Sequence, residues 1–269
     1  MHDMDKTAQT LSTDKQLLAF EHGFIYRAQQ ATSLRTRRHP GVILLSPPGQ
    51  PMRLETRDNS YVSSAIIVGP RVERSLFVKD TPFAALHVEP SHASYRMFES
   101  LDDCGGVKAL GGKKHPYFDA AQSLCHGAAP DLKTAEAVFD CVIDQTQAYL
   151  GQAPKQDVRM THILDIILGQ APEDYCFQSL LETVRLSAGR LSHLFTEEIG
   201  LSLRSFLIWR KTKEALRLLS GQDTLTTIAY ASGFSDSAHF CRTFQKSLGL
   251  APSRFRGDSC VQVYTAPTH

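Results

Sequence analysis

The apolar positions in the first third of the chain fall into short segments that turn residues separate. Five such segments lie between Phe20 and about His92, at 42–45, 52–55, 62–68, 75–78 and 83–88. Proline, glycine, aspartate and asparagine interrupt the pattern at 47–49, 58–59, 69–70 and 80–82. Short apolar segments at this spacing, with turn signals between them, are typical of an all-β unit. The pattern therefore predicts a small antiparallel sandwich or barrel.

Helical periodicity replaces the strand pattern from Ser91 onward. One face of a first helix would hold Tyr95, Phe98 and Leu101, and a glycine-rich joint follows at Gly105, Gly106, Gly111 and Gly112. After the break at Pro130, apolar residues recur at steps of three and four, which predicts an amphipathic helix over 132–150. Its stripe consists of Ala135, Val138, Phe139, Val142, Ile143, Thr146 and Tyr149. The stripe either packs on the sandwich or forms a dimer face, and we adopt the dimer face, centred on Phe139 and Ile143, as a working hypothesis.

A linker follows this helix, because Gly151 and Pro154 end it. A chain of 269 residues suits two domains, and we expect them over 15–150 and 157–257. Beyond the linker the pattern is helical throughout, over 158–170, 178–185, 188–199, 203–220, 226–232 and 236–248. So many helices in about a hundred residues require short, sharp connections.

Two of these connections share one design, which is a supporting helix, a tight turn and a second helix. Ser187 is placed to cap the second helix of the first unit, and Ser235 has the same place in the second unit. Gly233 in the turn and the small Ala229 let two helices cross closely, as a helix-turn-helix requires. The long helix between the units spans roughly 25 Å at 1.5 Å per residue. Two recognition helices about 34 Å apart, one turn of DNA, would enter successive major grooves on one face.

Charge is uneven along the chain, although the formal net charge is only +1. Between Arg185 and Arg256 there are eleven basic and five acidic side chains, whereas 1–154 holds sixteen basic and seventeen acidic ones. A basic segment attracts polyanions through counterion release, but a solvated face would have the same composition. Charge alone is therefore compatible with DNA binding and does not establish it.

The last hundred or so residues resemble the AraC/XylS family of bacterial transcription regulators. The matching positions are Arg210, Ala215, Leu218, Leu219, Leu225, Ile228, Ala229, Gly233, Phe234, Ser237, His239, Phe240, Arg242, Phe244, Lys246, Gly249, Pro252 and Phe255. The first unit matches less closely. Arg185 stands where the family often has glycine, and Leu181 and Glu182 replace commonly small residues.

The resemblance implies a sequence-specific transcription factor of the α+β class. It would have an N-terminal cupin-like β sandwich with helices for sensing and dimerisation, then an all-α C-terminal domain with two helix-turn-helix units. Base-edge contacts would come from the early turns of the recognition helices, here Arg190, Ser192, His193, Asp236, Ser237, His239 and Arg242. Phosphate contacts that fix orientation are expected from Arg204, Arg210, Lys211, Lys246 and Arg254. The expected partners are double-stranded DNA, RNA polymerase, a second copy of the chain and a small-molecule effector.

The N-terminal region offers two candidates for ligand chemistry. Three of its histidines could suggest a cupin metal site: His39, His87 and His92. The close His-x-His pair and following glutamate of such sites are missing, so scattered sandwich histidines are the better interpretation. The arginines at 35, 37 and 38 either bind an anionic effector or form a solvated charge run. The six cysteines include no C-x-x-C pair, which favours reduced structural thiols. We expect no metal and no cofactor.

An enzyme is the main rival class, as a cupin-type metalloenzyme or a DNA-repair protein with an appended helix-turn-helix. The glycine-rich segment 106–114 lacks the G-x-x-x-x-G-K spacing of a phosphate-binding loop. Cys125 and His126 lack the flanking proline and arginine of repair alkyltransferases, and no H-E-x-x-H or G-x-S-x-G occurs. We therefore expect no catalysis. A third class, an architectural DNA binder, would need a more basic surface.

The expected location is the cytoplasm. Residues 1–10 are polar and contain no apolar h-region, and the apolar runs are far shorter than a membrane span.

Overall fold

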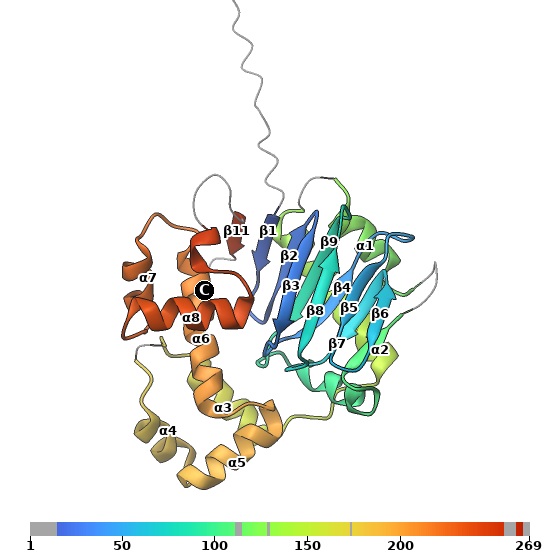
Figure 1. Cartoon of the computed structure of the whole chain (residues 1–269). Helices are drawn as coiled ribbons and strands as arrows, with labels where there is room; N and C mark the ends of the chain where they lie inside the picture. Colours follow the sequence, from blue (N-terminus) through green and yellow to red (C-terminus); the bar gives the residue numbers. More distant parts are fainter. Residues whose placement is uncertain (1–14, 111–114, 128–129, 173, 256–261, 266–269) are drawn as a thin grey trace, which may run out of the picture.

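The computed structural model describes residues 15–110, 115–127, 130–172, 174–255 and 262–265. A seven-stranded sheet contains, in spatial order, β10 (Val107–Ala109), β7 (Ala65–Val68), β4 (Gly41–Leu45), β9 (Phe83–Val88), β2 (Gly23–Ala28), β1 (Lys15–Ala19) and β11 (Gln262–Thr265). A four-stranded sheet contains β3 (Ala31–Thr36), β8 (Arg74–Val78), β5 (Met52–Glu55) and β6 (Ser60–Ser63). The sheets face one another as a sandwich (Figure 1). The expected β sandwich followed by a helical region is confirmed.

Residues of β4 show why the seven-stranded sheet is apolar on both faces. Side chains alternate across a strand, so Val42 and Leu44 pack with Leu54 of the opposite sheet while Ile43 and Leu45 point the other way. That outer face is covered by the 3-10 helix η1 (Tyr95–Cys104) and by α1 (Phe118–Cys125) and α2 (Leu132–Leu150). A strand between two layers is buried at every position, as β4 is.

The apolar stripe of α2 packs on the sandwich. Phe139 and Ile143 are each 2% exposed, and the Phe139 ring centroid lies 5.6 Å from that of Phe20. The Tyr117 and Thr146 hydroxyls lie 2.9 Å apart beside the stripe. Because contacts within one chain bury both residues, the hypothesis that Phe139 and Ile143 form a dimer face is wrong.

The expected strand over 62–68 is divided between the two sheets. β6 ends at Ser63 and β7 begins at Ala65, and the Ser63 hydroxyl donates to the Leu110 carbonyl over 2.7 Å at this corner. The sequence pattern also missed β1, β2, β3, β10 and β11. Some expectations lie outside the described residues: those on 1–10, Gly111, Gly112, the end of segment 106–114, Arg256, residue 257 and Cys260.

The six helices expected beyond the linker are all present. They are α3 (Val158–Leu168), α4 (Phe177–Val184), α5 (Ala188–Ile199), α6 (Leu203–Leu218), α7 (Leu225–Ala231) and α8 (Ser237–Leu248), with a 3-10 turn η2 (Pro252–Phe255) after them. Residues 151–157 join α2 to α3 without regular secondary structure. Among the described residues, no helix has the length and apolar character to cross a membrane.

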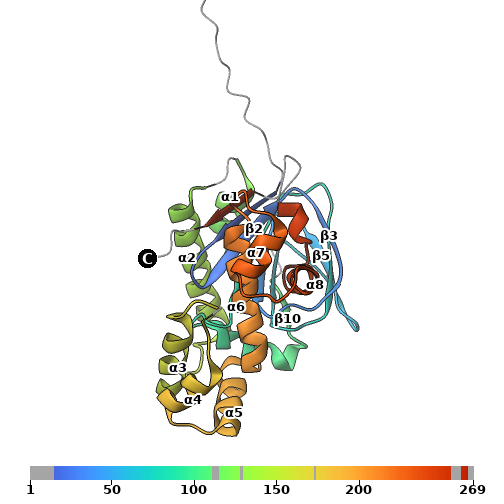
Figure 2. The same cartoon turned by 90° about the vertical axis from the view of Figure 1, so that its left-hand side faces the viewer.

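Helices α6 and α8 dock against the edge of the sandwich, while α3, α4 and α5 extend away from it (Figures 1 and 2). One core joins Leu17 and Phe24 of the sheet to Trp209 of α6. The Lys213 ammonium lies 3.1 Å from the Glu89 carboxylate, whose side chain is 3% exposed. The Trp209 indole donates to the same carboxylate over 3.4 Å. Strand β11 adds to this contact by pairing in parallel with β1.

Candidate nucleic-acid interface

The first helix-turn-helix unit consists of α4, a tight turn and α5. Arg185 ends α4 in the left-handed conformation, with φ 52°. A residue with a Cβ is strained there, which explains the preference of the family for glycine at this place. Ser187 is the N-cap of α5, as expected, and its hydroxyl accepts from the Arg190 amide over 3.3 Å. Leu191 and Phe195 of α5 are buried in the core that this unit shares with α3 and α6.

The second unit repeats this design with α7, a turn at Gly233 and α8. Gly233 has φ 82°, and the fully buried Ala229 lets the helices cross closely. The N-cap of α8 is Asp236, whose carboxylate accepts from the His239 amide over 2.6 Å. The expectation that Ser235 caps this helix is therefore wrong by one residue. Serine and aspartate can both cap a helix, and in this turn Asp236 occupies the N-cap position.

Helix α6 joins the two units, and its side chains donate to the connection before the first unit and to the turn of the second. Arg210 donates to the Gln170 carbonyl after α3 over 2.6 Å. Lys211 donates to the Gly233 carbonyl in the second turn over 2.5 Å. Both side chains are expected to contact phosphate, and this stays a prediction. In the structure Arg210 holds the connection between α3 and α4 on α6, and Lys211 holds the second turn on it.

Most of the other expected contact residues are exposed on the recognition helices and their flanks. Those with exposed side chains are Arg190, Ser192, His193, Arg204, Asp236, Arg242, Lys246 and Arg254. Ser237 and His239 are half-buried, and the His239 ring packs against Phe234 at 5.6 Å. His193 lies 3.4 Å from Glu197, one turn further along α5. The first turns of α5 and α8 thus present hydrogen-bonding groups and cations to the outside.

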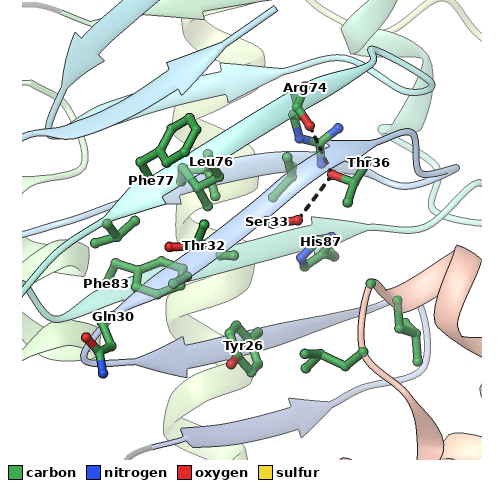
Figure 3. Close-up of a pocket in the computed structure, with 18 of the residues that line it drawn as sticks. Tyr26, Gln30, Thr32, Ser33, Thr36, Arg74, Leu76, Phe77, Phe83 and His87 are labelled. Atoms are coloured by element: carbon green, nitrogen blue, oxygen red, sulfur yellow. Dashed lines mark hydrogen bonds between the residues drawn. The ribbon is translucent and has the colours of Figure 1, made fainter.

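A second candidate site is a cavity of about 840 Å³ inside the sandwich, and the end of α8 contributes to its lining. Figure 3 shows many of the lining side chains. Arg38, Arg74 and His87 line the cavity together with apolar side chains of both sheets. The sequence points to Arg38 as one of the arginines at 35, 37 and 38 and to His87 as one of three sandwich histidines, but no sequence pattern points to Arg74. No group of three or more potential metal ligands occurs among the described residues. The histidines at 39, 87 and 92 are therefore not brought together.

The helix-turn-helix domain family model matches residues 180–258. Uncharacterised HTH-type transcriptional regulators match part of the chain. One from Staphylococcus aureus (strain MSSA476) is 34% identical over 108 residues, which is 40% of this chain and 14% of that protein. YijO of Escherichia coli (strain K12) is 27% identical over 143 residues, 51% of this chain and 50% of YijO. The chain thus spans at most half the length of these relatives.

Crystal structures of ToxT from Vibrio cholerae share the fold over most of the chain. An apo form of a ToxT variant superimposes with a TM-score of 0.55 at 11% identity, over 90% of this chain and 95% of ToxT. ToxT with a bound unsaturated fatty acid gives a TM-score of 0.52 at 14% identity, over 86% and 92%. At such identities the likeness concerns the fold alone.

The fold, the two turns and the family match define the C-terminal region as a helix-turn-helix DNA-binding domain. Within that class it is an AraC-type domain, in agreement with the resemblance noted in the sequence.

Proposed function

We propose that this protein is a sequence-specific transcription regulator that inserts α5 and α8 into successive major grooves of double-stranded DNA. One observation carries the proposal: two units of the same design present exposed first turns, and one helix, α6, contacts both of them. Phe206 of α6 packs on Phe195 of the first unit, and Lys211 donates to the turn of the second. A helix of 16 residues is about 24 Å long and stiff. It therefore suits two recognition helices one turn of DNA apart.

The contacts divide into those that read bases and those that hold phosphates. Arg190 and Arg242 are assigned to guanine, because a guanidinium can donate two hydrogen bonds to its major-groove edge. Further base-edge contacts are assigned to Ser192, His193, Asp236, Ser237 and His239. Phosphate contacts are assigned to Arg204, Lys246 and Arg254, which are exposed beside the recognition helices.

The wider proposal concerns how the regulator is organised. Residues 15–150 form a sensing and dimerisation domain and residues 157–257 the DNA-binding domain, in a cytoplasmic homodimer that acts with RNA polymerase and has no catalytic activity. Because α2 uses its stripe within the monomer, dimerisation uses another surface. The fold shared with ToxT, solved with an unsaturated fatty acid bound, and the cavity beside α8 support an effector that enters the sandwich.

The test compares two exposed side chains of α8. Arg242→Ala should weaken binding to the cognate site by about 1–3 kcal/mol and relax the preference at one base pair. Lys246→Ala should weaken binding to all sequences alike and lower the salt slope by about one contact. Binding is measured on a cognate site selected from random DNA and on its single-base variants, across a salt series.

Lys133→Ala is the matched control, because Lys133 is exposed on α2, in the other domain. It should leave both the affinity and the salt slope unchanged. Equal losses for Arg242→Ala on cognate and random DNA would show that Arg242 is a phosphate contact. A folded wild-type chain without any sequence preference would overturn the proposed function.

A further inference from the structure

The cavity inside the sandwich lies between the two sheets and reaches the DNA-binding domain. Side chains of β2, β4 and β9 form one wall and those of β3 and β8 form the other. Leu248 at the end of α8, with Gly249 and Leu250 after it, lies at one end. Figure 3 shows Arg74 and His87 on opposite walls, with Tyr26 and Phe83 further along. A volume of about 840 Å³ is in the range of small-molecule sites.

Charge inside this cavity is of one sign. Its lining residues include five cations and neither an aspartate nor a glutamate; the cations are Lys15, Arg38, Arg53, Arg74 and Lys79. Arg53 is balanced by Glu55 at 3.1 Å and lies over the Phe77 ring. Among the described residues, no carboxylate lies within ion-pair distance of Arg38 or Arg74.

Arg74 and Arg38 carry the argument, because their guanidinium groups are poorly compensated. Arg74 is 5% exposed, and its guanidinium donates to the Val72 carbonyl over 3.2 Å. Arg38 donates to the Ser33 hydroxyl over 3.4 Å, and its buried Nε has no hydrogen-bond partner among the described residues. Arg74 is buried and Arg38 is half-buried. A guanidinium shielded from water without a counter-ion is costly, so an anion between the two groups would stabilise both.

The titration behaviour of the cluster agrees with this geometry. Burial lowers the pKa of Arg74 to about 9, and the nearby Arg38 acts in the same direction. Burial also lowers the pKa of Arg38 to about 10. The pKa of His87 is well below its usual value, because of burial and both arginines. The cluster therefore presents two guanidinium cations and a neutral imidazole at pH 7.

We propose that the cavity binds an amphiphilic organic acid, with its carboxylate between Arg38 and Arg74 and its apolar body along Val42, Leu44 and Phe83. The apolar body follows from the walls, since these three side chains are buried where the two sheets meet. This inference rests on the proposed function, because it names the chemical class of the effector.

Arg38 also connects the cavity to the recognition helix α8. Gly249 ends α8 with φ 80°, and a Cβ built on Gly249 would clash with Nη2 of Arg38. The guanidinium that would bind the carboxylate thus lies directly against the end of α8. A bound acid contacts both domains and should hold the second helix-turn-helix unit against the sandwich.

The experiment separates the head group from the body with three probes: decanoate, 1-decanol and acetate, all below micelle-forming concentrations. Calorimetry measures their binding to the full chain, and the fluorescence of Trp209, the single tryptophan, follows urea unfolding at the domain contact. Decanoate should bind and raise the unfolding midpoint. Decanol and acetate should each bind at least about tenfold more weakly, since hydrogen bonds to charged groups contribute about 1.5–3 kcal/mol.

The variants test the two arginines against a matched cation of the same cavity. Arg74→Met and Arg38→Gln should weaken decanoate binding at least about tenfold, whereas Arg53→Gln should stay within about threefold of the wild type. Arg74→Lys should recover part of the affinity. Without ligand, Arg74→Met should be at least as stable as the wild type, because it removes an uncompensated buried charge. A purely structural arginine would instead destabilise the chain when it is replaced.

Equal binding of decanol and decanoate would overturn the inference, and so would undiminished decanoate binding by Arg74→Met. Sequence-specific DNA binding is measured on the same preparations without ligand. Intact DNA binding with no binding of decanoate refutes the organic-acid site alone, whereas loss of sequence preference refutes the proposed function.

Discussion

The ion pair between Lys213 of α6 and Glu89 after β9 should hold the second helix-turn-helix unit on the sandwich. The Glu89 side chain is 3% exposed and that of Lys213 is 30% exposed, with 3.1 Å between their charged atoms. Lys213 also donates to the Glu21 carbonyl. Lys213→Met would therefore leave a buried carboxylate whose remaining side-chain donor, among the described residues, is the Trp209 indole.

The magnitude follows from burial. Removing one partner of a fully buried ion pair costs about 3–5 kcal/mol, and an exposed pair contributes about 0–1 kcal/mol. Because water reaches part of Lys213, we expect Lys213→Met to lower the free energy of unfolding by about 2 kcal/mol. The double variant Glu89→Gln with Lys213→Met should recover at least half of this loss, since the amide introduced at position 89 keeps an acceptor for Trp209 without a charge.

Urea unfolding followed by Trp209 fluorescence measures the effect at the contact itself. Lys133→Met, an exposed change on α2, serves as the control and should shift the midpoint little. A loss below about 0.5 kcal/mol for Lys213→Met, which an exposed pair would give, or a double variant less stable than the single one, would refute the reasoning that this pair holds the two domains together.

Three further predictions concern single positions. Phe139→Ala should lower the free energy of unfolding in urea by about 3–5 kcal/mol, because it leaves a cavity at a buried site. A variant as stable as the wild type that sediments as a smaller species would instead show that α2 forms a dimer face. Gly249→Ala should cost more than about 1 kcal/mol, since its Cβ would meet Arg38 and its φ is 80°; unchanged thermal stability would contradict that contact. Arg185→Gly should raise the free energy of unfolding by about 0.5–1 kcal/mol, because glycine adopts the left-handed conformation with less strain. A lower free energy of unfolding would show that the Arg185 side chain makes a compensating contact.

The helices could be predicted from the sequence because their determinants are local. The apolar period of α5 and its cap Ser187 lie within one short segment, and the observed bounds, Ala188–Ile199, are those expected. The strand β4 was found for the same reason, since it is apolar throughout. The polar edge strand β3 has no such pattern, because its side chains are exposed or half-buried.

The residues of the candidate sites also differ in whether local sequence or distant contacts determine their environment. The exposure of Arg190 and Arg242 follows from helical periodicity, which places them opposite the buried leucines and phenylalanines of their helices. The environment of Arg74 depends on a strand pairing and on the end of α8, more than 170 positions away in the chain. The contact of Glu89 with Lys213 spans 124 positions. No local pattern contains such contacts. The sequence alone therefore cannot decide whether the arginines at 35, 37 and 38 bind an anionic effector or form a solvated charge run.

Footprinting of the full chain on a site selected from random DNA tests the central claim most directly. We expect two protected major-groove segments on one face, with centres about 10–10.5 base pairs apart. Arg190→Ala should remove protection from one segment and Arg242→Ala from the other, so each recognition helix can be assigned. A single protected segment in the wild type, or the same segment lost in both variants, would contradict the reading of two successive grooves by one chain.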